Sequence, residues 1–261
     1  MKTLAAVLAM VLIVAAISRA HADVKTEVVE YRHGDVVLEG YLAYDAALRG
    51  KRPGVLVVHE WNGHGPYVRK RAEQLARLGY VAFALDMYGK GVLAKDAKQA
   101  AALAGIYKGD RNLMRARAAA GLDVLRGRPE TDPARLAAVG YCFGGTTVLE
   151  LARSGADLVS VVSFHGGLDT PTPEDARNIK AKVLALHGGD DPFVPVKQVE
   201  AFQEEMRKGG VDWQFVSYGG AVHSFTNPES GNDNSEGAAY NERADRRSWE
   251  AMKAFFAETL E

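Results

Sequence analysis

Cys142 is the residue of this sequence whose type and surroundings most directly indicate chemistry. It is the single cysteine among 261 residues and lies at the centre of GYCFGG, residues 140–145. One cysteine cannot form an internal disulfide, so the thiol serves as a small apolar group, a redox group or a nucleophile. Gly-x-Cys-x-Gly after an apolar run is typical of a nucleophile elbow, a sharp strand-to-helix turn that points its central side chain into a cleft. The pattern therefore favours a nucleophile.

Such a turn would also prepare the thiol for attack. Side chains at Gly140 and Gly144 would collide with the neighbouring strand and helix, which accounts for both glycines. Cys142 would directly precede a helix, and the partial positive charge of a helix N-terminus favours a thiolate. The backbone N–H of Phe143 would then be a donor to the oxyanion that forms during acyl transfer.

An acid and a histidine follow the cysteine in the chain order of the α/β-hydrolase triad. Asp190 and Asp191 come after one apolar run, in HGGDDPFVP, and His223 comes after the next, in GGAVHSF. The histidine could take the thiol proton and later activate water, while an acid orients its ring. His165 and His187 also follow apolar runs, but His223 alone lies downstream of the acid pair.

The elements that must position these groups alternate along the chain. Two extended runs joined by His33-Gly34-Asp35 predict an N-terminal hairpin, and six buried-type strands are expected at 54–60, 80–86, 135–142, 158–166, 181–188 and 211–220. Helices are expected at 67–78, 144–154, 195–208 and 240–260, and as a pair over 94–126 divided near 109–110. This alternation predicts an α/β fold with a mostly parallel central sheet covered by helices on both faces.

In an open sheet of this kind, ligands bind at the carboxyl ends of the strands. The groups expected there are Glu60, Asp86, Cys142, the acid pair and His223. The histidines show neither HExxH nor paired Cys/His spacing, so we expect no metal and no cofactor. The net charge of −1 is spread without long charged blocks, which argues against nucleic acid or anionic lipid as partners.

Residues 1–22 read as a secretory signal peptide rather than as part of the fold. Lys2 precedes an apolar run from Leu4 to Ile17, and Ala20-His21-Ala22 is a small-x-small cleavage pattern. We expect cleavage after Ala22, a hydrolase domain over 23–261, a periplasmic location and no stable membrane association; an uncleaved anchor is the alternative.

In combination, the motifs HEWNG, LDMYGKG, GYCFGG, HGGDDPFVP and HSF resemble those of the dienelactone hydrolases, which are α/β-hydrolases with a cysteine nucleophile. The resemblance runs from about residue 26 to 259. It implies Cys142 as nucleophile, Asp191 as the acid that orients the base and His223 as the base. Asp190 would be a bystander.

The resemblance also assigns roles that the residues alone would not reveal. It implies that Glu60 contacts the resting cysteine and helps to generate the thiolate, and that the Trp61 backbone N–H is the second oxyanion donor beside Phe143. Tyr88 would contact substrate. Members that act on the diene lactone hold its carboxylate with two arginines, and this chain has Lys90 and Asn227 at those positions. Lysine lacks the bidentate fork and asparagine lacks charge, which weakens the case for that anionic substrate.

We therefore expect a monomeric hydrolase of small-molecule esters or lactones that works through an acyl-cysteine intermediate. Two alternatives stay open: a non-catalytic periplasmic binding protein of the same fold, and a redox-active thiol protein. A redox role is disfavoured because the chain has no second cysteine to resolve an oxidised thiol.

Overall fold

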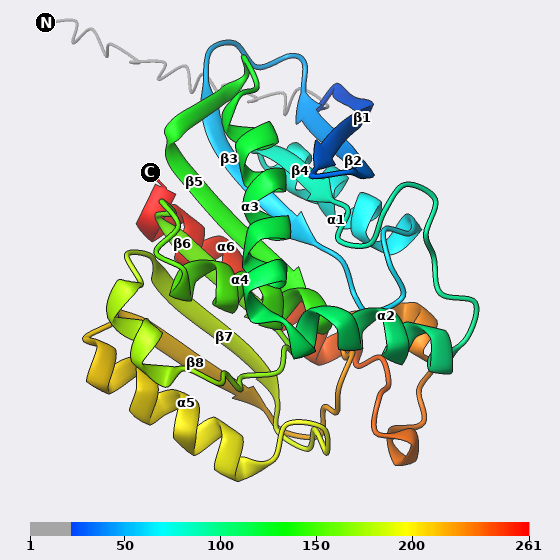
Figure 1. The fold of residues 1–261 in the computed structure, drawn as a ribbon, viewed down its shortest axis with the longest axis vertical. Helices are drawn as coiled ribbons and strands as arrows, with labels where there is room; N and C mark the ends of the chain where they lie inside the picture. Colours follow the sequence, from blue (N-terminus) through cyan, green and yellow to red (C-terminus); the bar gives the residue numbers. More distant parts are fainter. Residues whose placement is uncertain (1–21, 261) are drawn as a thin grey trace, which may run out of the picture.

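The computed structural model describes residues 22–260, and its centre is one eight-stranded sheet with the order β1-β2-β4-β3-β5-β6-β7-β8 (Figure 1). The strands are β1 (Val24–His33), β2 (Val36–Asp45), β3 (Arg52–Val58), β4 (Val81–Leu85), β5 (Thr131–Tyr141), β6 (Ser160–Phe164), β7 (Lys182–Gly188) and β8 (Trp213–Tyr218). β1 and β2 form an antiparallel hairpin, and β2 pairs antiparallel with β4. All the remaining pairings are parallel.

Helices lie on both faces of this sheet. They are α1 (Pro66–Arg77), α2 (Ala97–Gly109), α3 (Arg111–Arg126), α4 (Phe143–Arg153), α5 (Val196–Gly209) and α6 (Glu242–Leu260), with short 3-10 turns at Pro173–Asn178, Pro228–Ser230 and Asn234–Glu236. In Figure 1, α3, α4 and α5 lie in front of the strands and α6 lies behind them. The predicted α/β-hydrolase architecture is confirmed, including the hairpin and the division between α2 and α3.

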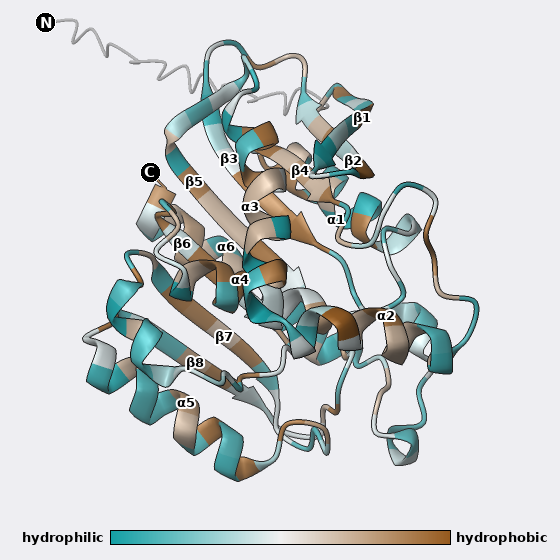
Figure 2. Cartoon of the chain, in the orientation of Figure 1, coloured by the Kyte–Doolittle hydropathy of each residue, from teal (hydrophilic) through white to brown (hydrophobic). Residues whose placement is uncertain are grey.

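Strand alternation explains why helices are needed on both sides. In β3, Leu56 and Val58 belong to the core shared with α2, α3, α4 and α5, whereas Val55 and Val57 belong to the core shared with α1 and α6. A strand buried on both faces reads as a continuous apolar run, and Figure 2 shows the central strands mostly in brown. Figure 2 also shows α5, at the outside, mostly in teal.

The edge strand β1 differs from the strands at the centre. It carries four charged side chains at Lys25, Glu27, Glu30 and Arg32, and most of its residues are exposed or half-buried. Glu27 and Glu30 form ion pairs with Arg128 and Lys90. This edge of the sheet is therefore polar and charged.

The predicted signal peptide lies outside the described residues except for Ala22. Within 22–260, none of the helices has the length and hydropathy needed to span a bilayer.

Candidate active site

The elbow at Cys142 is a strained turn between a strand and a helix. β5 ends at Tyr141, α4 begins at Phe143, and Cys142 between them has φ 55° and ψ −116°. A Cβ on Gly140 would overlap the Gly144 carbonyl, and a Cβ on Gly144 would overlap the Val58 carbonyl. Both glycines are therefore required by close backbone approach, as the sequence predicted, and strain of this kind is concentrated at functional sites.

The structure brings Cys142, His223 and Asp191 into one hydrogen-bonded chain. The distance from His223 Nε2 to Cys142 Sγ is 3.0 Å, and that from His223 Nδ1 to Asp191 Oδ2 is 2.8 Å. The other Asp191 oxygen accepts the Phe193 N–H at 2.8 Å, which fixes the carboxylate. The Asp191 side chain is fully buried and Asp190 is exposed, so the geometry favours Asp191 of the pair.

The neighbours of His223 change its pKa. Burial by itself lowers the pKa of His223, but the adjacent Cys142 and Asp191 outweigh it and raise the pKa to about 10. A negative group on each side of the ring favours the imidazolium. Cys142 itself is partly open to solvent.

The two predicted oxyanion donors flank the elbow. The Phe143 N–H belongs to the first residue of α4, where a helix offers no acceptor of its own. Trp61 lies in the turn that follows β3, closed by a bond from Gly63 N to Glu60 O at 3.2 Å. Gly144 packs against the end of β3, so this turn and the start of α4 are adjacent.

Glu60 has different partners from those that the resemblance implied. Its carboxylate accepts bonds from Asn227 Nδ2 at 2.6 Å and Ser224 Oγ at 3.4 Å, while the Cys142 thiol is bonded to His223. Burial raises the Glu60 pKa, and the Asn227 bond opposes that shift. Asn227 is itself buried and its amide holds the Glu60 carboxylate, and both residues line a cavity of about 180 Å³.

Lys90 and Tyr88, the other two predicted substrate contacts, also bond other residues of the protein. Lys90 Nζ lies 2.6 Å from Glu30 Oε2 on the edge strand and is half exposed. Tyr88 is buried, its hydroxyl donates to the Trp61 carbonyl at 3.0 Å, and its ring lies 5.6 Å from that of Phe143. Tyr88 therefore contacts both Trp61 and Phe143, the two predicted oxyanion donors.

Sequence reasoning missed several neighbours of His223. Ser224 and Thr226 bond Glu60 and His165, and Phe193, more than half exposed, places its ring 5.5 Å from that of His223. The PFVP and HSFT stretches lie beside the predicted acid and base, and that proximity in the chain is the one signal that could have indicated them.

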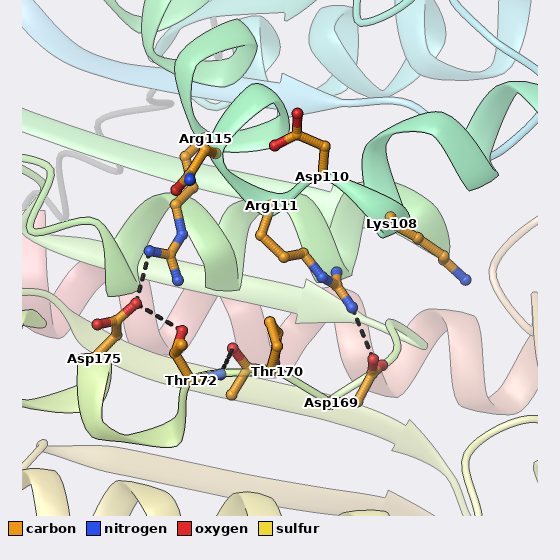
Figure 3. Close-up of a pocket in the computed structure, with 11 residues that line it drawn as sticks. Lys108, Asp110, Arg111, Arg115, Asp169, Thr170, Thr172 and Asp175 are labelled. Atoms are coloured by element: carbon orange, nitrogen blue, oxygen red, sulfur yellow. Dashed lines mark hydrogen bonds and ion pairs between the residues drawn. The ribbon is translucent and has the colours of Figure 1, made fainter.

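A separate polar cavity of about 560 Å³ lies where α2 and α3 meet the segment after β6 (Figure 3). Its arginines are paired: Arg111 with Asp169 and Arg115 with Asp175, each at 2.7 Å. No triad residue lines it. In residues 22–260 no group of three or more His, Cys, Asp and Glu side chains has the arrangement of a metal site.

A mostly parallel sheet, a cysteine elbow and a downstream acid–histidine pair define an α/β-hydrolase. A model of the dienelactone hydrolase family matches residues 38–260, and the chain belongs to that family. It is accordingly a hydrolase of esters or lactones, as predicted.

Known relatives cover almost the whole fold. A solved structure described as m3DLH is 44% identical, with a TM-score of 0.88 over 92% of this chain and 100% of its own. The dienelactone hydrolase-like promiscuous phosphotriesterase P91, from metagenomic libraries, is 41% identical with a TM-score of 0.87 over the same shares. A relative from Aquifex aeolicus, provisionally named a carboxymethylenebutenolidase, is 28% identical over 88% of this chain and 97% of its own.

Proposed function

We propose that the protein hydrolyses uncharged carboxylic esters or lactones through the triad Cys142, His223 and Asp191, with an acyl-cysteine intermediate. The observation that carries the proposal is the chain of two bonds, 3.0 Å from sulfur to His223 and 2.8 Å from His223 to Asp191. A nucleophile, a base and a buried acid in this order are what covalent acyl transfer requires.

The reaction runs in two halves. The Cys142 thiolate attacks the carbonyl carbon, a C–S bond forms, and the carbonyl electron pair moves to oxygen beside the Trp61 and Phe143 N–H groups. Collapse breaks the C–O bond, and the leaving alkoxide takes the proton from the His223 imidazolium. Neutral His223 then removes a proton from water as it attacks the thioester, and the thiolate leaves with the acid released.

The surroundings of the triad favour an uncharged substrate. Of the two positions where the diene-lactone enzymes have arginine, one holds Lys90, paired with Glu30, and the other holds Asn227, bonded to Glu60. Glu60 itself is buried and would repel a substrate carboxylate if ionised. We therefore place neutral esters ahead of anionic lactones.

Phosphotriesters are a second candidate class. They are also uncharged, and P91, named as a promiscuous phosphotriesterase, is 41% identical to this chain over nearly its full length. The same thiolate would attack phosphorus and expel an aryloxide, and water deprotonated by His223 would then cleave the S–P bond, releasing the phosphodiester and the thiolate. Paraoxon, measured beside the carboxylic esters, tests this class.

The first experiment is rapid mixing of the mature protein with p-nitrophenyl acetate, with Cys142→Ser in parallel. We expect a burst of nitrophenolate that equals the enzyme concentration and is absent from the variant, because acyl-cysteine accumulates before hydrolysis. Equal release by both proteins would overturn the cysteine mechanism. No release by a wild-type protein that still alkylates at Cys142 would favour the binding-protein alternative.

Substrate charge is tested with a matched pair of esters. p-Nitrophenyl butyrate and p-nitrophenyl hemisuccinate are similar in length, but the second carries a carboxylate. We expect kcat/KM to be at least about tenfold higher for the butyrate, a difference of about 1.4 kcal/mol in transition-state binding. A preference for the hemisuccinate would contradict the assignment of uncharged substrates.

We also propose that the leader is removed after Ala22 and that residues 23–261 act as a monomer in the periplasm. The described chain is compatible with this cut, since Asp23 is already anchored: its N–H bonds Asp45 Oδ1 at 3.0 Å and its carbonyl accepts the Ala46 N–H at 2.8 Å. Mass analysis of the protein in a periplasmic fraction, together with light scattering, tests cleavage, location and oligomeric state. Retained Lys2 would contradict cleavage.

A further inference from the structure

His165 is a buried titratable group that the proposed reaction does not use. It follows β6, is fully buried and has φ 39°. Cys142, His165 and Ser224 are the three non-glycine residues with positive φ in the described part of the chain, and all three lie around the triad. Positive φ is unfavourable for such side chains and persists where surrounding bonds impose it.

Both ring nitrogens of His165 are engaged. Nδ1 accepts the Cys142 N–H at 3.1 Å, a donor shared with the Phe164 carbonyl at 3.0 Å, and Nε2 lies 2.7 Å from Thr226 Oγ1. Burial and then the positive charge of His223 hold the pKa of His165 well below its usual value. The ring is therefore neutral, and because Nδ1 accepts, the proton is on Nε2 and is donated to Thr226.

Thr226 is anchored from the opposite side. Its hydroxyl lies 2.6 Å from the Tyr67 hydroxyl, and its carbonyl accepts a bond from Arg71 at 2.7 Å. Arg71 also donates to Tyr67 at 3.1 Å and pairs with Asp245 of α6 at 2.6 Å. Thr226 comes three residues after the base, so the loop that carries His223 is held by α1 and α6.

We propose that His165 is a positioning residue that joins the nucleophile turn to the loop carrying the base. One nitrogen holds the backbone of Cys142 and the other holds Thr226, so a bridge behind the reacting atoms sets the separation of Cys142 Sγ and His223 Nε2. This inference rests on the proposed roles of Cys142 and His223. A displacement of about 1 Å at such a pair can cost a factor of about 100 in rate.

Paired variants at His165 separate positioning from bulk stability. His165→Leu removes both bonds, whereas His165→Asn keeps an acceptor near the Nδ1 position and tolerates positive φ. We expect His165→Leu to lower kcat on p-nitrophenyl acetate by about 10- to 100-fold with KM within about threefold, since binding is spared. His165→Asn should recover most of that loss. Thr226→Val removes the second bond of the bridge, together with the Tyr67 bond, but spares the bond to Cys142, and it should give an intermediate loss.

The pH dependence of alkylation by iodoacetamide supplies a readout that a purely structural role would not move. Because the imidazolium would no longer be held against sulfur, we expect the alkylation midpoint of His165→Leu to rise by about one pH unit or more relative to wild type. His64→Leu also loses a buried imidazole, outside this bridge, and should keep the wild-type midpoint.

The outcomes separate this inference from the proposed function. A wild-type burst, with kcat and the alkylation midpoint unchanged in His165→Leu and Thr226→Val, would overturn the positioning role and leave the cysteine mechanism intact. Loss of the cysteine-dependent burst in wild type would overturn the mechanism itself. If His165→Leu does not fold, Thr226→Val still decides, because a normal alkylation midpoint and kcat in that variant would also overturn the role.

Discussion

At the scale of single residues, the charge on His223 is the property from which the chemistry follows. Its ring lies between a thiol and a buried carboxylate, 3.0 and 2.8 Å away, and this holds its pKa at about 10. A raised histidine pKa means that the proton is kept at neutral pH and is lost only as the pH rises through about 10. In the mechanism proposed above, this is the proton that the leaving group takes.

Removing the sulfur charge should change that titration. In Cys142→Ser the negative neighbour is lost while burial, which lowers the pKa, stays. We expect the pKa of His223 to fall by about 1–3 units, the range typical of losing one close opposite charge. Carbon-13 NMR of labelled histidine across pH 5–11 measures it, and an unchanged titration would contradict the thiolate–imidazolium pair.

The acid pair provides a matched comparison of neighbouring residues. Asp191→Asn cannot accept the His223 N–H in the same way, and an analogous change in serine triads lowers kcat by a factor of about 10⁴ because the wrong tautomer is favoured. We expect a loss on the order of 10³–10⁴ here. Asp190 is exposed, and Asp190→Asn should stay within about threefold of wild type. Comparable losses of kcat in the two variants would contradict the assignment of Asp191 as the acid of the triad.

The sequence predicted which residues come together at the candidate site better than it predicted their other contacts. The positions of Cys142, the acid and His223 follow from motif order, and the structure brings them together. Glu60 and Asn227 lie 167 residues apart in the chain, and their 2.6 Å bond depends on two loops meeting over the sheet. The His165 bridge likewise depends on tertiary contact, which no local pattern encodes.

At the scale of secondary structure, the elbow depends on close packing between β3, β5 and α4. Gly144→Ala would place a methyl group against the Val58 and His59 carbonyls, which belong to the end of β3. Gly105 in α2 has open space around its Cβ position and offers a control in an ordinary helical site.

We expect Gly144→Ala to lower the free energy of unfolding by about 3 kcal/mol or more, since backbone carbonyls cannot move aside cheaply. Gly105→Ala should raise it by about 0.5–1 kcal/mol through the unfolded state. Urea denaturation measures both. A Gly144→Ala protein of wild-type stability would contradict the close approach.

The central strands were predictable because their apolar runs are buried on both faces, whereas β8, at the other edge of the sheet, is mostly exposed or half-buried and is not the buried strand that the sequence predicted. Helix ends were also marked in the sequence. Asp96 and Asp110 cap α2 and α3 with side-chain bonds to Gln99 N and Leu113 N, which explains the division that the sequence indicated near 109–110. The order of strands across the sheet needed the structure, because register depends on contacts between distant segments.

At the scale of the whole molecule, a buried ion cluster joins α4 to α5. Arg153 is fully buried and bonds Glu150 Oε1 at 3.0 Å and both oxygens of Glu205, at 2.7 and 2.8 Å. Removing one partner from such a cluster leaves charge without compensation in the interior.

Arg153→Met should therefore lower the free energy of unfolding by about 3–5 kcal/mol. Lys208→Met removes a cation from the exposed pair with Glu204 on α5 and should cost less than about 1 kcal/mol. Thermal and urea unfolding compare the stabilities of the two variants. Lys208→Met should hydrolyse p-nitrophenyl acetate at the wild-type rate, which serves as a check on the assay. A cost below 1 kcal/mol for Arg153→Met would show that the cluster is dispensable.

The charged edge strand has a consequence for how this protein behaves in crowded surroundings. A free strand edge offers unpaired N–H and C=O groups on which another chain can add, and this is how soluble sheets grow into fibres. Lys25, Glu27, Glu30 and Arg32 along β1 would have to lose contact with water in any such addition, and desolvating charged groups is unfavourable. The charges on β1 therefore disfavour the addition of another strand at this edge of the sheet.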